Sequence, residues 1–177
     1  MGKVIAFSNQ KGGSGKTTLS ANIAVLWSNS GYKVAVIDAD AQKSLTYWIE
    51  ERKKYYGEGD IGISSYNFDI RNINEELKNI KRKYDFIIID SPPSITYDTL
   101  QIVRASNKVF VPAQPSPLDL MATLPFLELA KKERKNPIII LNRVMARAKL
   151  TDAMILRLRY AGAKIARSRL SSKVIFA

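Results

Sequence analysis

The sequence contains neither cysteine nor histidine, and both absences restrict the chemistry available to the protein. Without cysteine there are no disulfides, no thiolate zinc sites and no iron–sulfur clusters. Without histidine, the commonest metal ligand and the imidazole base of catalytic triads are also missing. Any catalysis must therefore depend on lysine, aspartate, hydroxyl groups and the backbone.

Long hydrophobic runs are absent as well. No apolar stretch approaches the ~18 residues of a membrane span, and the run 4–7 after Lys3 is too short for the core of a signal peptide. We therefore expect a cytoplasmic protein with no membrane partner. For a chain of 177 residues we expect a single domain, 1–177, that is large enough to bury a core without covalent cross-links.

Acidic residues are scarce in the last quarter of the chain. Residues 1–130 carry 15 basic and 14 acidic side chains, whereas residues 131–177 carry 13 basic and 2 acidic ones. Almost all of the net charge of +12 therefore lies in the C-terminal segment. Such a segment is typical of proteins that bind nucleic acid or an anionic membrane, although a solvated surface kept for solubility has the same composition.

Short apolar runs recur along the chain and predict the strands of a sheet. They occupy residues 4–7, 34–37, 86–89, 109–111 and 138–141. Because these runs are continuous, we expect strands that are covered on both faces. Helix-like segments lie at 16–30, 44–54, 74–83, 118–135 and 151–160, and a loop with one edge strand around 61–68 fills 55–73. This alternation predicts an α/β fold with a doubly wound, mainly parallel sheet and helices on both faces.

The segment Lys11-Gly12-Gly13-Ser14-Gly15-Lys16-Thr17-Thr18 has the composition of a phosphate-binding loop. It follows the first predicted strand and opens the first helix, so backbone N–H groups and the helix dipole converge on one point. Lys16 can reach the β- and γ-phosphates of a nucleotide, and the Thr17 hydroxyl can ligate Mg²⁺. Gln10 stands where the usual pattern has glycine, so this is the deviant form, with a second lysine, Lys11, at the head of the loop.

Three aspartates follow predicted strands. Asp38 and Asp40 come after the strand 34–37, and Asp90 comes after the strand 86–89. Open α/β sheets bind ligands at the carboxyl ends of their strands, where a carboxylate can hold Mg²⁺ directly or through water. We expect Asp90 and Asp38 at a metal, with Asp38 either a direct ligand or a residue behind one. Each aspartate alone could instead be a helix cap or a turn former.

These motifs resemble the ParA/MinD family of deviant Walker-A ATPases, and within it the small plasmid-partition ParA proteins of the ParF type. The matching pieces are 11–18, 38–42, 90–94, 115–119 and 141–143, in the family's order. The resemblance implies a P-loop NTPase fold and weak, Mg²⁺-dependent hydrolysis of ATP to ADP. It further implies an ATP-dependent homodimer, non-specific binding to nucleoid DNA, and stimulation by a centromere-binding protein of the ParB/ParG kind during plasmid or chromosome segregation.

The same resemblance implies roles for individual residues. Lys11 would contact the nucleotide of the opposite subunit, Asp40 would position the attacking water, and Asp90 would be the Walker-B carboxylate. The expected catalytic group consists of Lys11, Lys16 and Asp40. Thr17, Asp38 and Asp90 form the expected metal site. The expected nucleotide contacts are Gly12, Gly13, Ser14, Gly15, Lys16, Thr17 and Thr18, with Asn142 and Arg143 near the adenine, and 117–119 is expected near the dimer face.

Two departures separate this sequence from the family pattern. Ala41 stands where the family commonly has proline, which loosens the backbone around Asp40. The family usually continues into a closing C-terminal helix, whereas this sequence ends within the apolar stretch 174–177. Either the sequence is shortened or the protein is naturally short, and in both cases we expect the sheet to lack its last cover and to favour self-association.

We expect the basic C-terminal segment to contact DNA phosphates without reading bases, because no recognition-helix motif accompanies it. The candidate residues are Arg143, Arg147, Lys149, Arg157, Arg159, Lys164, Arg167, Arg169 and Lys173. The basic run 52–54 is the alternative DNA surface.

Other functions share the phosphate loop. A MinD-like membrane-surface regulator needs an amphipathic C-terminal helix, for which 170–176 is a short and poor candidate. A small-molecule ligase of the dethiobiotin-synthetase or cobyrinate type would need its metabolite for turnover, and a nucleotide-binding interaction protein would not hydrolyse ATP. Iron–sulfur reductases and cluster carriers are excluded, because their clusters require cysteine.

Overall fold

The strands of this protein form one parallel sheet. The computed structural model describes residues 1–57, 62–145 and 149–172, with residues 149 and 150 given by their backbone only. Within these ranges the strands are β1 (Lys3–Phe7), β2 (Val34–Asp38), β3 (Ile63–Tyr66), β4 (Phe86–Asp90), β5 (Lys108–Ala113), β6 (Ile138–Leu141) and β7 (Lys164–Ile165). They lie in the order β3-β2-β4-β1-β5-β6-β7, and each pairing is parallel.

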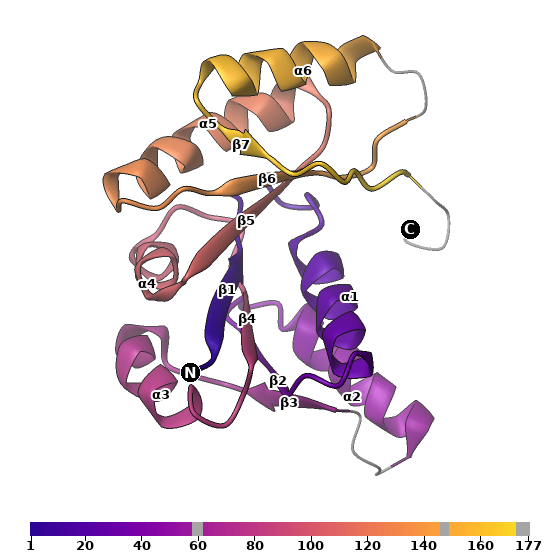
Figure 1. Cartoon of the computed structure of the whole chain (residues 1–177), viewed down its shortest axis with the longest axis vertical. Helices are drawn as coiled ribbons and strands as arrows, with labels where there is room; N and C mark the ends of the chain where they lie inside the picture. Colours follow the sequence, from indigo (N-terminus) through magenta and orange to yellow (C-terminus); the bar gives the residue numbers. More distant parts are fainter. Residues whose placement is uncertain (58–61, 146–148, 173–177) are drawn as a thin grey trace.

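Helices cover both faces of this sheet. They are α1 (Lys16–Asn29), α2 (Ser44–Tyr56), α3 (Ile73–Ile80), α4 (Tyr97–Ala105), α5 (Pro117–Lys132) and α6 (Lys149–Tyr160), with a 3-10 turn, η1 (Ile70–Asn72), before α3. The helices α1 and α2 lie on one face and α3 to α6 on the other (Figure 1). The predicted doubly wound parallel sheet is confirmed, and β3 is the expected edge strand. The sequence patterns predict neither α4 nor β7.

Local signals begin and end the helices that frame the functional end of the sheet. Gly15 precedes α1 with a φ of 103°, a left-handed conformation that glycine adopts without strain. At the start of α5, the Ser116 side chain accepts a hydrogen bond from the Asp119 N–H at 3.1 Å, and Pro117 occupies the first turn. These caps fix where each loop turns into a helix.

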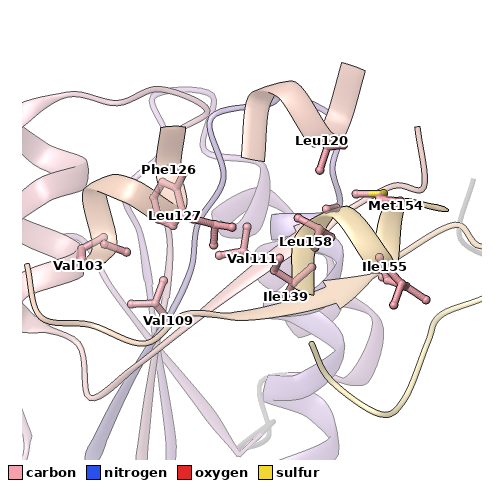
Figure 2. Close-up of a cluster of buried hydrophobic side chains, with 13 residues drawn as sticks. Val103, Val109, Val111, Leu120, Phe126, Leu127, Ile139, Met154, Ile155 and Leu158 are labelled. Carbon is pink, nitrogen blue, oxygen red and sulfur yellow. The ribbon is translucent and has the colours of Figure 1, made fainter. Parts of the chain in front are cut away.

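The core is continuous across the sheet because adjacent residues of each strand face opposite helices. Ile87 and Ile89 pack with α3 and α4, whereas Ile88 packs with α1 and α2, and all three are fully buried. A further cluster joins the C-terminal part of the chain to the same sheet, with Phe126 from α5 and Leu158 from α6 packed over β5 and β6 (Figure 2). The basic C-terminal segment is therefore anchored to the domain by apolar burial.

The α1 face of the sheet is less completely covered toward β6. Phe110, Ile138 and Ile140 are only partly buried there. The segment Leu170–Ser172 is extended: Ser171 forms a parallel bridge with Val144, and the Leu170 N–H donates to the Leu141 carbonyl at 2.9 Å. The described part of 170–176 thus continues the sheet edge instead of opening an amphipathic helix. Among the described helices, none has the length and apolar character to span a bilayer.

Candidate functional site

The strands β1, β2 and β4 end at one level of the sheet. Asp90, the last residue of β4, is in register with Phe7 on one side and with Asp38 on the other. The loop that follows β1 therefore starts beside Asp90, and Asp38 lies one strand further along the same edge of the sheet. The sequence places these groups about 30 to 80 residues apart, and the parallel pairing brings them together.

The phosphate-binding loop turns its carbonyls outward. The Gln114 side chain donates to the Gly13 carbonyl at 2.9 Å, and the Asn142 amide donates to the Ser14 carbonyl at 2.9 Å. Within the described chain, the backbone N–H groups of residues 12–15 donate to no protein acceptor. Free N–H groups at a helix N-terminus are the donor set that an oxyanion such as phosphate requires. The loop thus fits a nucleotide phosphate.

Asn142 also explains one glycine of the loop. A Cβ atom at residue 15 would collide with the Asn142 side-chain amide, and the φ of 103° is unfavourable for other residues. The glycine lets the segment after β6 pack directly on the loop. Asn142, which the resemblance places near adenine, therefore also holds the phosphate loop in shape.

Asp90 is joined to the first turn of α1 by two hydroxyl groups. The Thr17 hydroxyl donates to one carboxylate oxygen at 2.6 Å, and the Ser20 hydroxyl donates to the other at 3.2 Å. Asp90 is almost fully buried, and this burial raises its pKa to about 7, assisted by the negative charge of Asp38 and opposed by the Thr17 hydrogen bond. Asp90 forms no ion pair with a described residue, although the charge of Lys16 acts on it from a distance, and a buried carboxylate of this kind suits a metal ion.

Lys16 points its ammonium group into the same region. Its Nζ donates to the Lys11 carbonyl at 3.3 Å, and the side chain is buried. Desolvation lowers the pKa of Lys16 below the ordinary value, while attraction to Asp90 and Asp40 opposes that shift. A desolvated cation with one weak backbone contact is free to contact a phosphate oxygen.

Asp38 and Asp40 have different surroundings. The buried Asp38 carboxylate accepts hydrogen bonds from the Thr46 N–H at 2.9 Å, the Thr46 hydroxyl at 3.0 Å and the Asp40 N–H at 3.1 Å. Asp40 is partly exposed, and its carboxylate accepts from the Gln42 N–H at 3.0 Å. Asp38 thus joins the segment after β2 to the first turn of α2. The turn at Asp40 is held by these bonds although Ala41 replaces the family's proline.

Lys11 is paired within its own chain. Its ammonium group lies 2.5 Å from a carboxylate oxygen of Asp119, which is buried in the first turn of α5. The Ser116 hydroxyl and the Gln114 N–H also donate to Asp119, at 2.7 and 3.1 Å. Sequence reasoning placed 117–119 near a dimer face but did not predict this contact. The capping pattern Ser116-x-x-Asp119 signals the helix start, and nothing in it indicates the lysine.

A cavity of about 310 Å³ lies between the loop and Asp40. Its lining includes the loop glycines, Lys16, Thr17, Asp40 and Arg143. An apolar groove of about 590 Å³ adjoins it past Asn142 and runs between α1 and Leu170–Ser172. In the described part of the chain, no group of three or more acidic side chains could hold a metal by itself. Any metal here would need the Thr17 hydroxyl, a carboxylate and ligand oxygens together.

Comparison with known proteins agrees with this geometry. The family described as the CobQ/CobB/MinD/ParA nucleotide binding domain matches residues 5–174. The chain belongs to this family.

Relatives within the family differ in their described roles. The chain is 34% identical over 156 residues to "Maintenance of carboxysome distribution protein A" of Halothiobacillus neapolitanus, covering 85% of this chain and 70% of the relative. It is 29% identical over 146 residues to "Chromosome-partitioning ATPase Soj" of Treponema pallidum, covering 64% of this chain and 58% of the relative. The solved structure of pNOB8 ParA bound to nonspecific DNA has a TM-score of 0.75 at 23% identity, covering 99% and 87% of the two chains. This likeness shows the shared ParA/MinD fold.

Some of the expected DNA-contacting residues lie within the described part of the structure, and some lie outside it. Arg147 and Lys173 lie outside the described residues, as does the side chain of Lys149. Of the remaining six, five are exposed, lie away from the phosphate cavity and form no ion pair with any described residue: Arg157, Arg159, Lys164, Arg167 and Arg169. They come from α6, β7 and the segment after β7. Arg143 instead lines the phosphate cavity.

We expect Asp90→Asn to stabilise the metal-free protein in a pH-dependent way. Because the folded-state pKa of Asp90 is raised to about 7, the native state binds this proton more tightly than the unfolded chain. The free energy of unfolding of the parent protein should therefore fall as pH rises from about 4 to 7, and asparagine removes that loss.

Thermal unfolding in metal-free buffer at several pH values measures this effect. The gain in Tm of Asp90→Asn over the parent should be largest above pH 7 and shrink toward pH 4. Asp98→Asn, which removes an exposed carboxylate from α4, is the matched control and should show no such trend. A gain that does not change with pH would contradict the assigned burial cost.

Proposed function

We propose that this protein is an ATP-switched DNA-partition ATPase, which dimerises on ATP and holds DNA without sequence preference. The observation that carries the proposal is the loop itself: four of its backbone N–H groups have no acceptor in the described part of the chain, Lys16 and Thr17 line the cavity beside it, and the Thr17 hydroxyl donates to the buried Asp90. This set matches the triphosphate and Mg²⁺ of a bound nucleotide. The name of the Treponema pallidum relative supports ATP hydrolysis and partition.

The two adjoining cavities suit the two ends of ATP. The phosphates would lie in the cavity of about 310 Å³, against the loop and Lys16. The nucleoside would lie past Asn142 and Arg143, where the groove of about 590 Å³ begins and its lining is mainly apolar. Thr17 and Asp90 would hold Mg²⁺, which would neutralise charge on the phosphates. Because the Asp38 carboxylate already accepts three hydrogen bonds, we assign it to orienting Asp40 and the start of α2.

Asp40 is the residue we assign to positioning the attacking water. It lines the phosphate cavity, is partly exposed, and keeps one carboxylate oxygen without a hydrogen bond to any described residue. The sequence has no histidine base, so positioning and charge neutralisation must supply the catalysis. Unassisted hydrolysis should therefore be slow, and stimulation by a centromere-binding partner of the ParB/ParG kind is the expected control.

We expect Asp40→Ala to bind ATP and lose hydrolysis by roughly 10²-fold or more, because it removes the proposed water contact, and otherwise only the acceptor of the Gln42 N–H, while the phosphate loop is untouched. Fluorescent ATP binding and phosphate release measure the two steps separately. Lys16→Ala should lose nucleotide binding itself, and Glu50→Ala, which removes an exposed carboxylate of α2, should behave like the parent. If Asp40→Ala released phosphate at the parent rate, the water-positioning role would be wrong.

Dimerisation on ATP would require Lys11 to change partners. In the structure this lysine neutralises the buried Asp119 carboxylate of its own chain. Lys16 is placed to contact the phosphates bound to its own subunit. A second lysine at the loop is therefore more useful if it contacts the nucleotide of the neighbouring subunit. The Ser116 hydroxyl and the Gln114 N–H would continue to satisfy Asp119 after Lys11 leaves. The Lys11–Asp119 ion pair would thus keep the Lys11 side chain in place as long as the protein is a monomer.

We expect Lys11→Ala to bind ATP and remain monomeric, because the contact to the neighbouring nucleotide is lost. Asp119→Asn should have the opposite effect and dimerise at a lower ATP concentration, because asparagine has no charge to pair with the lysine, while its amide oxygen can still accept from the Gln114 N–H and its backbone N–H can still donate to the Ser116 hydroxyl. Light scattering coupled to size-exclusion chromatography, with ATP and with ADP, measures both. Equal ATP-induced dimer in Lys11→Ala and parent would refute the role in trans.

DNA binding is assigned to the exposed cations of α6, β7 and the segment that follows. Their support is exposure, the lack of ion-pair partners among the described residues, and the nonspecific DNA complex of the pNOB8 ParA relative. A second candidate function, distribution of a protein cargo, is favoured by the 34% identity to the Halothiobacillus neapolitanus relative. Both functions use the same ATP switch and differ in the partner that stimulates it.

We expect Arg157→Ala/Arg159→Ala to weaken binding to a random-sequence duplex and to flatten the log–log salt dependence by about two units, because two phosphate contacts disappear. Fluorescence anisotropy between about 50 and 200 mM salt measures both quantities. ATP hydrolysis should be unchanged, since the carboxylates at the strand ends are untouched. An unaltered salt slope would place the DNA surface elsewhere, with 52–54 as the first alternative.

A further inference from the structure

A basic hollow lies at the end of the sheet opposite the phosphate loop. It has a volume of about 430 Å³, and its lining includes Lys3, Lys33, Lys81, Arg82 and Lys83. We call these five residues the sheet-end cluster. No part of the nucleotide site described above lies here, and none of the five belongs to the basic C-terminal segment. The first 130 residues are nearly neutral as a whole, so the cluster is a local concentration of charge.

The register of the strands brings the cluster together. Lys3 of β1 and Val34 of β2 are both in register with Phe86 of β4, so Lys3 and Lys33 flank the start of β4 on its two sides. Two strand spacings place their backbones about 10 Å apart. The turn between α3 and β4 supplies the other three cations. In Figure 1 this end of the sheet carries the N-terminus, and α6 lies at the far side of the molecule.

Backbone hydrogen bonds hold the hollow in shape. The Gly2 N–H donates to the Lys81 carbonyl at 2.7 Å, the Lys3 N–H to the Asp85 carbonyl at 2.9 Å, and the Asp85 N–H to the Lys33 carbonyl at 2.8 Å. A Cβ atom at residue 2 would collide with the Tyr84 carbonyl, so glycine permits this close approach. The cations therefore stand on a fixed frame and not on a loose loop.

The charges of the cluster are not balanced within the described chain. None of its five side chains forms an ion pair or a hydrogen bond with a described residue. Asp85 is the single carboxylate in the lining, and one of its oxygens accepts from the Lys33 N–H. Lys3, Lys33, Arg82 and Lys83 are exposed, and Lys81 is partly buried. Repulsion among unpaired cations is relieved when an anion binds among them.

We propose that the sheet-end cluster binds the phosphate backbone of duplex nucleic acid as a second surface, separate from the C-terminal one. A spread of about 10 Å exceeds one phosphate group but suits a duplex, which carries one negative charge per ~1.7 Å of its axis. Four of the five cations are lysines, which act as point charges, and the guanidinium fork of Arg82 fits phosphate as well as carboxylate. The dense and regular charge of a duplex favours it over an acidic peptide, and no base reading is expected.

The position of the cluster has a consequence for the ATP switch. The proposed nucleotide site and the Lys11–Asp119 pair lie at the carboxyl ends of the strands, so a dimer formed there would leave the opposite end of the sheet uncovered. Binding at the sheet-end cluster should therefore persist without nucleotide. One subunit could then contact DNA on two sides. The inference rests on the proposed function only for its choice of ligand.

Three double variants test the inference by anisotropy on a random-sequence duplex, without nucleotide and over a salt series. Arg82→Ala/Lys83→Ala removes part of the cluster, and Arg157→Ala/Arg159→Ala removes part of the C-terminal surface formed by α6, β7 and the segment after β7. Lys78→Ala/Lys132→Ala removes two exposed lysines of α3 and α5 that belong to neither surface. We expect the first variant to bind about 10-fold more weakly and with a salt slope about two units flatter. The third should match the parent. Circular dichroism and Tm confirm that each variant is folded.

The outcomes separate the two surfaces. If Arg82→Ala/Lys83→Ala keeps parent affinity while Arg157→Ala/Arg159→Ala loses it, the inference is overturned and the proposed C-terminal surface stands. The reverse result supports the inference and overturns that surface. Parallel titrations with polyglutamate and with phosphatidylserine vesicles test the ligand class. Loss of binding to either probe in the first variant, with duplex binding unchanged, would also overturn the inference.

Discussion

The common level at which β1, β2 and β4 end positions most of the functional groups of this protein. At that level Asp90 lies between Phe7 and Asp38, and the loop after β1 turns over it into α1. This arrangement buries the Asp90 carboxylate, and the desolvation of its charged form raises its pKa. Two hydroxyl groups of α1 are its hydrogen-bond partners. A divalent metal ion bound beside Asp90 would offset that cost.

Much of this could be read from the sequence, because the relevant signals are local. Continuous apolar runs predicted the central strands, and the glycine-rich loop with its Gly-Lys-Thr-Thr predicted the phosphate site. The helix α4 was missed because its start, 92–98, carries two prolines and polar residues, and its helical character depends on burying Ile102 and Val103. The Lys11–Asp119 pair spans 108 residues, so no local pattern contains it. Asn142 against Gly15 is likewise a product of tertiary packing.

Lys11 connects the fold to the proposed switch because two demands fall on one side chain. In the monomer it neutralises a carboxylate that is almost completely buried, which makes the pair costly to separate unless Asp119 stays hydrogen-bonded. The Ser116 hydroxyl and the Gln114 N–H meet that condition. A lysine released to a neighbouring nucleotide would leave behind a solvated or capped anion instead of an orphaned one. The first turn of α5 therefore allows the exchange at moderate cost.

Under the two proposals, the parallel sheet would separate two kinds of phosphate recognition by strand direction. At the carboxyl ends, the loop lines a cavity of about 310 Å³ near buried carboxylates, where a compact triphosphate with its metal would fit better than an extended polyanion. At the amino ends, exposed lysines surround an open hollow with a single carboxylate. Side chains there offer charge but no shaped set of backbone donors. A single nucleotide would therefore bind weakly, whereas a longer polyanion would make several such charge contacts at once. Because both ligands are phosphates, this difference in donor type and geometry, and not charge alone, would keep ATP and nucleic acid on their own surfaces.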